Sequence, residues 1–372
     1  MNTVAPAKSM PVPLRLVEEE LSRQMKALQG DDESPVHRAH MSNLVIFCDE
    51  PELAESVADD VPEIVASHPA RVLLVIGEPE TGSETEGVTA SVIVRQMKQG
   101  RHERSLSEQV TLHASGSAVN KLAFSVRALL IGDLPINLWW AARQPPPLVG
   151  PLLYDLAENA QQIIYDSLGW LEPARAVSAT STWLQQFEQN LPGGRWRVAS
   201  DLNWRRLKYW RRMIKQALAP GAVAAAMELL VEHGPHAVIQ AWELVSWLTS
   251  QLGWKPQAGK IEQGLEIAWQ FQAPDGPVRV RIRRLPEGPS EILLLRLQCN
   301  LAGVPSAVAI RAEDSRRLVA QQEGAGTAPN TLNFQPQPRA ELVGRQLSDR
   351  ERDPVFSASM AVAQELAKSL LD

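Results

Sequence analysis

Cysteine is almost absent from this chain, with only Cys48 and Cys299 among 372 residues. A disulfide framework is therefore excluded, and the two thiols, on different predicted strands, are expected to be buried and unreactive. No apolar run approaches the ~20 residues that a transmembrane helix needs. The first 13 residues lack the apolar core of a signal peptide. We expect a cytoplasmic protein without membrane contact.

An excess of positive charge is also missing, because 37 Lys and Arg residues face 43 Asp and Glu residues, a net charge of −6. A general nucleic-acid-binding protein shows the opposite balance. Basic residues here form local patches on an acidic protein, which suits recognition of one acidic partner.

The signatures of common enzyme sites are absent as well. The first predicted strand is followed by Asp49-Glu50-Pro51, which places carboxylates where a G-x-G-x-x-G turn would offer bare amides to a pyrophosphate. The loop 77–87 holds four glutamates and no lysine. No G-x-S-x-G elbow occurs, and Gly-Pro between His233 and His236 prevents one helical face from presenting both imidazoles to a metal. We expect no catalytic residue, no metal and no cofactor.

Residues 41–172 alternate between strand and helix patterns. Strands are predicted at 43–48, 71–76, 88–97, 109–113, 136–140 and 162–166, and helices at 49–67, 117–130 and 152–159. Because the first strands are apolar throughout, they are typical of a layered α/β domain with a partly parallel sheet. A leader, residues 1–40, precedes this domain, flexible except for a short amphipathic helix at 14–28.

Residues 173–320 predict a second α/β domain. Helices are expected at 177–189, 200–218 and 235–252. Three strands at 265–272, 278–285 and 291–299 are predicted to form an antiparallel meander, to which 306–312 can add a further strand. Periodicity does not decide between helix and strand for 223–231. A polar loop and a terminal helix at 358–371 occupy 321–372. The fold class is therefore two layered α/β domains, with a partly parallel first sheet and an antiparallel meander in the second.

What the chain does contain is tryptophan, with 11 Trp against 3 Tyr. In the segment 200–216, helical spacing puts Leu207, Trp210, Ile214 and Leu218 on one side and Arg205, Lys208, Arg212 and Lys215 on another. Ser200 or Asp201 can cap this helix. Trp139 and Trp140 are neighbours at a strand end, so one can pack inward while the other turns toward a second layer or a partner.

These two tryptophan stretches resemble a known family. Residues 129–140 resemble the L-L-x-x-D-x-P-x-x-x-W-W segment of the OpcA family of glucose-6-phosphate dehydrogenase assembly proteins, and 200–211 resemble its D-L-x-W-x-R-L-x-x-W-R segment. The likeness runs from about residue 41 to about 299 in the family's order. The residues that match the motifs, and are expected to be structural, are Asp133, Pro135, Trp139, Asp201, Trp204, Arg206, Leu207 and Trp210.

The resemblance implies a non-catalytic allosteric activator that binds glucose-6-phosphate dehydrogenase and favours its active oligomer, thereby controlling the oxidative pentose phosphate pathway. It also favours a strand at 223–231 and implies redox responsiveness, which only Cys48 and Cys299 could carry here. The expected partner-binding residues are Arg205, Lys208, Arg212, Lys215 and Trp140. The sequence does not specify the protein's own oligomeric state.

One alternative of a different class stays open. Ser115 and Ser117 precede a predicted helix, where an anion can bind, although a helix cap explains them equally well. Together with the cations at 205, 208, 212 and 215, they could serve an α/β enzyme or sensor for an anionic small molecule such as a sugar phosphate.

Overall fold

The computed structural model describes residues 11–29, 40–78, 87–99, 103–189, 197–262, 266–301, 303–324, 326 and 328–371. Half of the expected leader and most of the glutamate-rich loop 77–87 lie outside these residues. The chain forms two compact units. The first unit comprises residues 1–165, 191–200 and 338–351, and the second unit comprises 166–190, 201–337 and 352–372.

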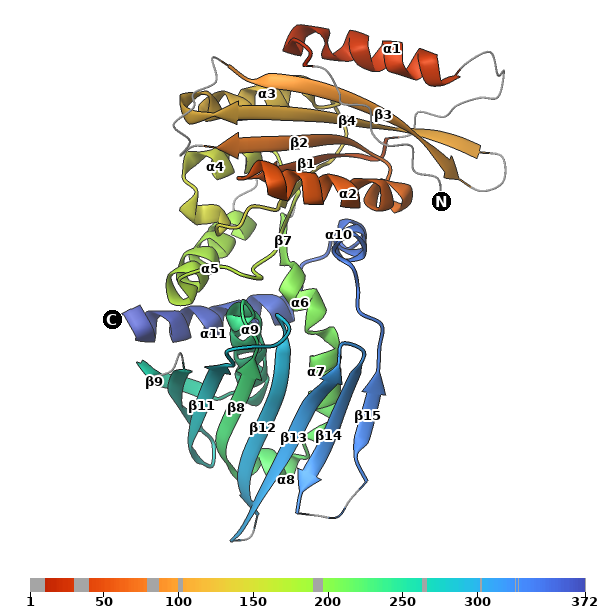
Figure 1. Ribbon diagram of the computed structural model, residues 1–372. Helices are drawn as coiled ribbons and strands as arrows, with labels where there is room; N and C mark the ends of the chain where they lie inside the picture. Colours follow the sequence, from red (N-terminus) through yellow and green to blue (C-terminus); the bar gives the residue numbers. More distant parts are fainter. Residues whose placement is uncertain are drawn as a thin grey trace. The chain divides into compact units, whose positions relative to one another are not determined.

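The first unit contains a seven-stranded sheet of order β3-β4-β2-β1-β5-β6-β7 (Figure 1). The strands are β1 Ser42–Cys48, β2 Ala70–Glu78, β3 Thr89–Gln99, β4 Glu103–Ser115, β5 Ile136–Trp140, β6 Gln162–Tyr165 and β7 Val198–Asp201. The pairs β1–β2, β1–β5, β2–β4 and β5–β6 are parallel, while β3 runs antiparallel to β4. Every residue of β1 is buried, as its continuous apolar sequence predicts for a strand covered on both faces.

Helices cover both faces of this sheet, with α2 on one face and α3 on the other (Figure 1). The helical elements are η1 Leu14–Leu16, α1 Val17–Gln29, α2 Pro51–Ser67, η2 Gly116–Lys121, α3 Leu122–Leu129, η3 Pro146–Leu148, α4 Pro151–Ala157 and α10 Arg339–Ser348. The predicted amphipathic helix is present as α1, which buries Val17 and Leu21. An ion pair of 2.6 Å between Arg71 and Glu18 ties it to the sheet.

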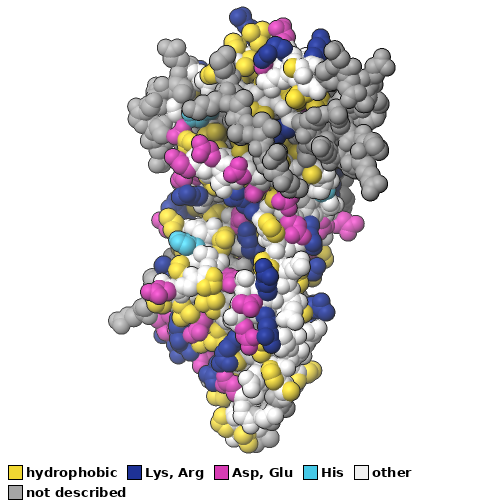
Figure 2. All heavy atoms as spheres, turned by 45° about the vertical axis from the view of Figure 1, so that its right-hand side comes forward, with side chains coloured by type: hydrophobic (Ala, Val, Ile, Leu, Met, Phe, Trp, Pro, Cys, Tyr) yellow, Lys and Arg dark blue, Asp and Glu magenta, His cyan; other side chains and the backbone are white. Residues whose placement is uncertain are grey.

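The second unit contains an eight-stranded sheet of order β15-β14-β13-β12-β8-β11-β10-β9. Its strands are β8 Ala226–His233, β9 Lys255–Glu262, β10 Glu266–Ala273, β11 Gly276–Arg284, β12 Ile292–Leu301, β13 Val304–Asp314, β14 Arg317–Glu323 and β15 Asn330–Asn333. All neighbours are antiparallel except β8 and β11. On the face shown in Figure 2, basic and acidic side chains lie next to one another over part of this unit.

The helices of the second unit are α5 Pro173–Gln189, α6 Leu202–Arg206, α7 Lys208–Ala217, α8 Pro220–Ala224, α9 Val238–Leu252 and α11 Pro354–Leu371. Trp269 on β10 marks the face of the sheet that the helices cover. Its indole N–H donates to the Leu366 carbonyl of α11 at 3.2 Å, and its ring meets Trp242 of α9 edge-on at 4.8 Å. As predicted, α9 ends at Gly253, which takes the left-handed φ of 68° that glycine tolerates best.

The fold class expected from the sequence is confirmed, with two corrections to its details. The three central strands do not form a consecutive meander, because β8 inserts between β11 and β12 and so resolves the ambiguity at 223–231 as a strand from Ala226. The units divide after residue 165 instead of near 172, and the C-terminal part is shared between them. None of the described helices has both the length and the apolarity that crossing a bilayer requires.

Candidate functional site

The tryptophan-rich segment of the second unit forms two helices, α6 and α7, which meet at Leu207. Asp201 caps α6, since its Oδ1 accepts the Asn203 backbone N–H at 2.8 Å. The predicted packing face is confirmed for Leu207, Trp210 and Ile214, which are all buried. This packing fixes the direction in which the opposite face of α7 points.

The opposite face of α7 carries the predicted cations. Lys208, Arg212 and Lys215 are exposed, whereas Arg205 on α6 is half-buried. The spacing of four and three residues puts the exposed three on one stripe of the helix. Lys215 also lies over the Trp247 ring, with its Nζ 5.9 Å from the centroid. We call Lys208, Arg212 and Lys215 the basic row.

Beneath α6, polar side chains form a tight network. Arg206 binds Asp166 through two parallel contacts of 2.7 Å and also donates to Asn203 Oδ1 at 2.9 Å. The Asn203 amide donates to Ser167 Oγ at 2.8 Å, and the Ser167 backbone N–H donates to Asp201 Oδ1 at 3.2 Å. The planar guanidinium suits this two-point contact with a carboxylate. The motif arginine therefore orders the residues that begin α6.

Asp201 of this network and Glu243 beside it are both buried carboxyl groups. Burial and the nearby Asp166 raise the pKa of Asp201 to about 6, although its hydrogen bonds from Ser167 and Asn203 oppose that shift. Burial and the adjacent Asp201 raise the pKa of Glu243, on α9, well above its usual range. A carboxyl group in such surroundings keeps its proton. Burial thus favours the neutral form of Glu243, which lies beside the capping residue of α6.

Trp204 and Arg211 complete the packing between these helices. The Arg211 guanidinium stacks 3.6 Å from the Trp204 ring centroid and donates to the Trp204 carbonyl at 2.8 Å. Burial lowers the pKa of Arg211 to about 10. The Trp204 indole N–H donates to Asp353 Oδ2 at 2.7 Å, and its ring lies 5.3 Å from that of Phe356 on α11. Sequence reasoning did not single out Asp166, Glu243 or Asp353.

The other motif, in the first unit, is internal. Trp139 and Trp140 are both fully buried; Trp140 packs 4.4 Å from Phe47 and its N–H donates to the Gln144 carbonyl at 3.1 Å. The expectation that Trp140 contacts a partner is therefore wrong for this structure. Alternation does turn the two rings to opposite faces of β5, but helices cover both faces.

Asn43 holds the start of this first motif. Its Oδ1 accepts the Ile131 N–H at 2.9 Å, its Nδ2 donates to the Ile131 carbonyl at 3.0 Å, and its own N–H donates to the Pro135 carbonyl at 2.8 Å. Asp133 adopts a positive φ of 64° in the turn between these bonds. Asp133 and Pro135 thus shape the loop before β5, which agrees with a structural role for the motif.

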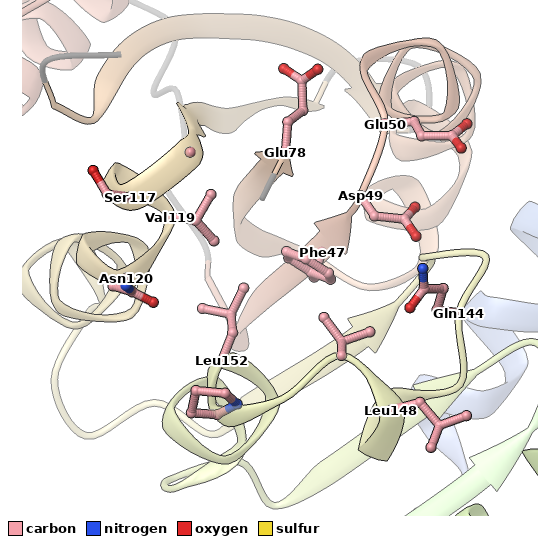
Figure 3. Close-up of a pocket in the computed structure, with 13 residues that line it drawn as sticks. Phe47, Asp49, Glu50, Glu78, Ser117, Val119, Asn120, Gln144, Leu148 and Leu152 are labelled. Carbon is pink, nitrogen blue, oxygen red and sulfur yellow. The ribbon is translucent and has the colours of Figure 1, made fainter. Parts of the chain in front are cut away.

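A cleft of about 680 Å³ lies in the first unit at the carboxyl ends of the parallel strands. The order of the sheet reverses at β1, and such a point is where α/β proteins of this kind bind dinucleotides. Figure 3 shows Phe47 in the middle of the lining, Asp49 and Gln144 pointing toward each other on one side, and Ser117 and Asn120 on the other.

The chemistry of the cleft opposes a pyrophosphate. Asp49 and Glu50 follow β1, as the sequence predicted, and Glu78 ends β2. The helix that a pyrophosphate would meet, α2, begins at Pro51, which has no N–H to donate. The Asp49 carboxylate already accepts the Arg143 backbone N–H at 3.2 Å. Like charges and a missing donor therefore stand where an anion would have to bind.

The alternative anion site at Ser115 and Ser117 gains no support from its surroundings. Ser115 is buried before a short 3₁₀ helix, and Ser117 lines the cleft that contains the three carboxylates. His113 faces Glu78, with Nε2 2.5 Å from Oε1. The cations that this alternative also needs belong to the second unit.

Both cysteines are buried, and they lie in different units. Burial raises the pKa of the Cys48 thiol to about 12 and also raises the pKa of Cys299. A thiol held in its neutral form is a poor nucleophile and a poor metal ligand. Across the described ranges, no group of three or more His, Cys, Asp and Glu side chains is arranged to hold a metal ion.

Comparison with known protein families finds a match for each of the two units. Residues 61–182 match the family model described as the glucose-6-phosphate dehydrogenase subunit N-terminal domain, and residues 197–360 match the C-terminal domain model of the same family. Each match covers one of the two tryptophan motifs.

Two curated relatives are similar over most of the chain. The putative OxPP cycle protein OpcA of Nostoc punctiforme is 26% identical over 327 residues, which cover 82% of this chain and 67% of the relative. The protein of the same name from Synechocystis is 26% identical over 327 residues, which cover 80% of this chain and 64% of the relative. The chain thus spans about two thirds of the length of these relatives.

Among solved structures, an oxidoreductase from Sinorhizobium meliloti has a TM-score of 0.51 at 10% sequence identity. The match covers 89% of this chain and 96% of that one. At this identity the likeness concerns the fold alone. Because the two family models together cover most of the chain and the relatives align across both units, the chain belongs to the OpcA family of glucose-6-phosphate dehydrogenase assembly proteins.

Proposed function

We propose that this protein binds glucose-6-phosphate dehydrogenase and favours its active oligomer without catalysing a reaction itself. The observation that carries the proposal is the match of both units to domains described as a subunit of that dehydrogenase. Control over the first step of the oxidative pentose phosphate pathway would follow. The likeness of the fold to an oxidoreductase does not argue for catalysis, because carboxylates and a proline occupy the dinucleotide position.

Activation by binding needs only a difference in affinity. A protein that binds the active form of an oligomeric enzyme more tightly than the inactive form shifts the equilibrium by that ratio. Each tenfold preference corresponds to about 1.4 kcal/mol. A rigid surface that matches only one arrangement of the enzyme is therefore sufficient.

The basic row is our candidate for this surface. Three exposed cations stand on one stripe of α7, and the buried face of the same helix fixes their direction. Charges at the rim of an interface mainly raise the association rate and the specificity for a complementary partner. The proposed partner surface on the dehydrogenase is accordingly acidic.

The test measures dehydrogenase activity, substrate affinity and oligomeric state with and without the protein, using the dehydrogenase from the same cells. We expect the protein to raise activity or substrate affinity and to shift the enzyme toward a larger assembly. If none of the three quantities changes, the proposed function is wrong.

A charge-reversal variant tests the surface separately. Lys208→Glu/Arg212→Glu should weaken binding to the dehydrogenase by about tenfold or more, because close like charges oppose association. The matched control, Arg316→Glu/Lys368→Glu, changes the same net charge at exposed positions of the same unit and should bind like the wild type. Equal loss in both variants would indicate an effect of net charge and remove the basic row as the contact.

A further inference from the structure

The sheet of the second unit has one face that no described helix covers. Along β11, Val278, Val280 and Ile282 are buried on the helix-covered side, so Arg279, Arg281 and Arg283 alternate to the other side. Trp269 on the neighbouring β10 confirms which side the helices occupy. We call the side that carries these arginines the open face.

Charged side chains on the open face pair across the strands. Five arginines and five glutamates from seven strands take part, and each has at least one partner of opposite sign. The pairs are Arg279–Glu262 at 2.8 Å, Arg281–Glu266 at 3.0 Å, Arg283–Glu266 at 2.9 Å, Arg283–Glu232 at 3.2 Å, Arg296–Glu323 at 2.6 Å, Arg311–Glu323 at 3.6 Å and the close pair Arg281–Glu228. Lys260 adds one more cation beside Glu262, on the edge strand β9.

The composition of this face differs from that of an ordinary solvated sheet. Exposed ion pairs contribute only about 0–1 kcal/mol each, so stability alone gives little reason for so many of them. The cations are arginines except at the edge, and arginine is enriched at protein interfaces whereas lysine is depleted. Half-buried Leu230 and Leu294 lie among the charges, with Leu230 directly between Arg281 and Arg296 in register.

The face is also large enough for an interface. Eight strands spaced about 4.8 Å apart span about 34 Å, and seven residues of strand span about 24 Å, which gives a face of about 800 Å². A stable interface of ordinary size buries about 800 Å² on each partner. Ala268, Ala307 and Ala309 lie among the paired charges on this face.

We propose that the open face is a self-association surface on which a second copy of this chain packs, sheet against sheet, about a two-fold axis. The charge pattern of the face indicates which partner binds there. Six cations and five anions alternate, so the surface is nearly neutral and carries both signs. Such a surface is complementary to a rotated copy of itself. The basic row carries one sign only and suits an acidic partner. The two surfaces of the second unit therefore have different partners.

Sedimentation equilibrium of the full chain tests this proposal. We expect a dimer at micromolar concentration, and we expect Leu230→Gln/Leu294→Gln to weaken it by about tenfold or more, because two apolar side chains at the centre are replaced by amides that demand water. The matched control is Met227→Gln/Val304→Gln. It makes the same change at two exposed apolar residues of the same sheet whose side chains alternate to the opposite side.

Three outcomes would overturn the proposal: a monomeric wild type up to about 100 μM, a dimer that both double variants weaken equally, or a dimer that neither affects. If the wild type is monomeric and the Leu230→Gln/Leu294→Gln variant no longer binds the dehydrogenase, the open face is instead the binding surface for that enzyme. Thermal unfolding of each variant establishes that it is folded. The sedimentation measurement uses this protein alone, so whether the chain dimerises is independent of the proposed function.

Discussion

Arg206 shows at the scale of one residue how the motif stabilises the second unit. Its two contacts of 2.7 Å to Asp166 neutralise a carboxylate that would otherwise face the buried Asp201. Arg206→Ala should lower the free energy of unfolding by about 3 kcal/mol, because removing one partner leaves the other charge unpaired in a poorly solvated place. Urea denaturation measures the change.

The control for this substitution is Arg175→Ala. Arg175 pairs with Glu172 at 3.2 Å, but both side chains are 66% exposed. An exposed pair contributes at most about 1 kcal/mol, so this variant should remain close to the wild type. Similar losses in the two variants would show that Arg206 is only another surface ion pair.

Asp201 and Glu243 make the stability of the second unit depend on pH. Burial raises the pKa of Asp201 from 3.8 to about 6 and raises the pKa of Glu243 well above its usual value. Each acid therefore binds its proton more tightly in the folded state than in the unfolded chain. This contribution to stability is fully present below a pH of about 4 and is lost as the pH rises through about 6 and beyond.

Glu243→Gln separates this effect from other titrations. The amide cannot ionise, whereas burial and Asp166, which raise the pKa of Asp201, remain in place. The nearby groups Asp166, Arg206 and Arg211 stay unchanged. We expect the wild-type free energy of unfolding to fall more steeply than that of the variant between about pH 5 and about pH 8, because only the wild type must release the Glu243 proton. Urea denaturation at several pH values gives both curves; parallel curves, or an equal effect of exposed Glu287→Gln, would contradict the prediction.

At the scale of helices and strands, the spacing of apolar residues correctly located the elements that are buried on both faces or on one face only. The apolar runs of β1 and β2 and the helical spacing in α7 were predictable because burial on two faces, or on one, leaves a simple pattern. Strand β9 was not predictable, since it is a largely exposed edge strand that reads Lys-Pro-Gln-Ala-Gly-Lys-Ile-Glu and alternates poorly. Helix α10 follows a polar stretch and contains Gly344, which weakens the helical pattern.

Local sequence patterns did not reveal which distant strands and side chains pair with one another. The parallel neighbours β8 and β11 are separated by helix α9 and two strands, so the apparent meander of the later strands concealed the insertion of β8. The site shows the same limit. The partners of Arg206 and Trp204 lie 40 and 149 residues away, whereas the basic row needs only spacing along one helix. Trp140 was wrongly predicted to contact a partner, because the alternation of side chains along a strand shows that neighbouring residues face opposite sides of the sheet but not what covers each side.

At the scale of the whole molecule, the fold and its cleft contrast with the residues that line it. The Sinorhizobium meliloti oxidoreductase has a similar fold, and the cleft of the first unit lies at the reversal point of the sheet. A pyrophosphate bound there would approach the carboxylates of Asp49 and Glu50 and the start of a helix at Pro51, which has no N–H. Unlike the open face and the basic row, this site is arranged to repel an anion.

We therefore expect no binding of NAD⁺ or NADP⁺ at concentrations up to about 1 mM, the weak end of ordinary ligand affinities. Calorimetric titration and thermal shift measure this directly, with the dehydrogenase itself as a positive control. Asp49→Asn/Glu50→Gln removes the repulsion but not Pro51, so this variant should gain at most weak binding. A clear heat of binding or a raised unfolding temperature for the wild type would show that the cleft still holds a dinucleotide, and it would reopen a catalytic function for the first unit.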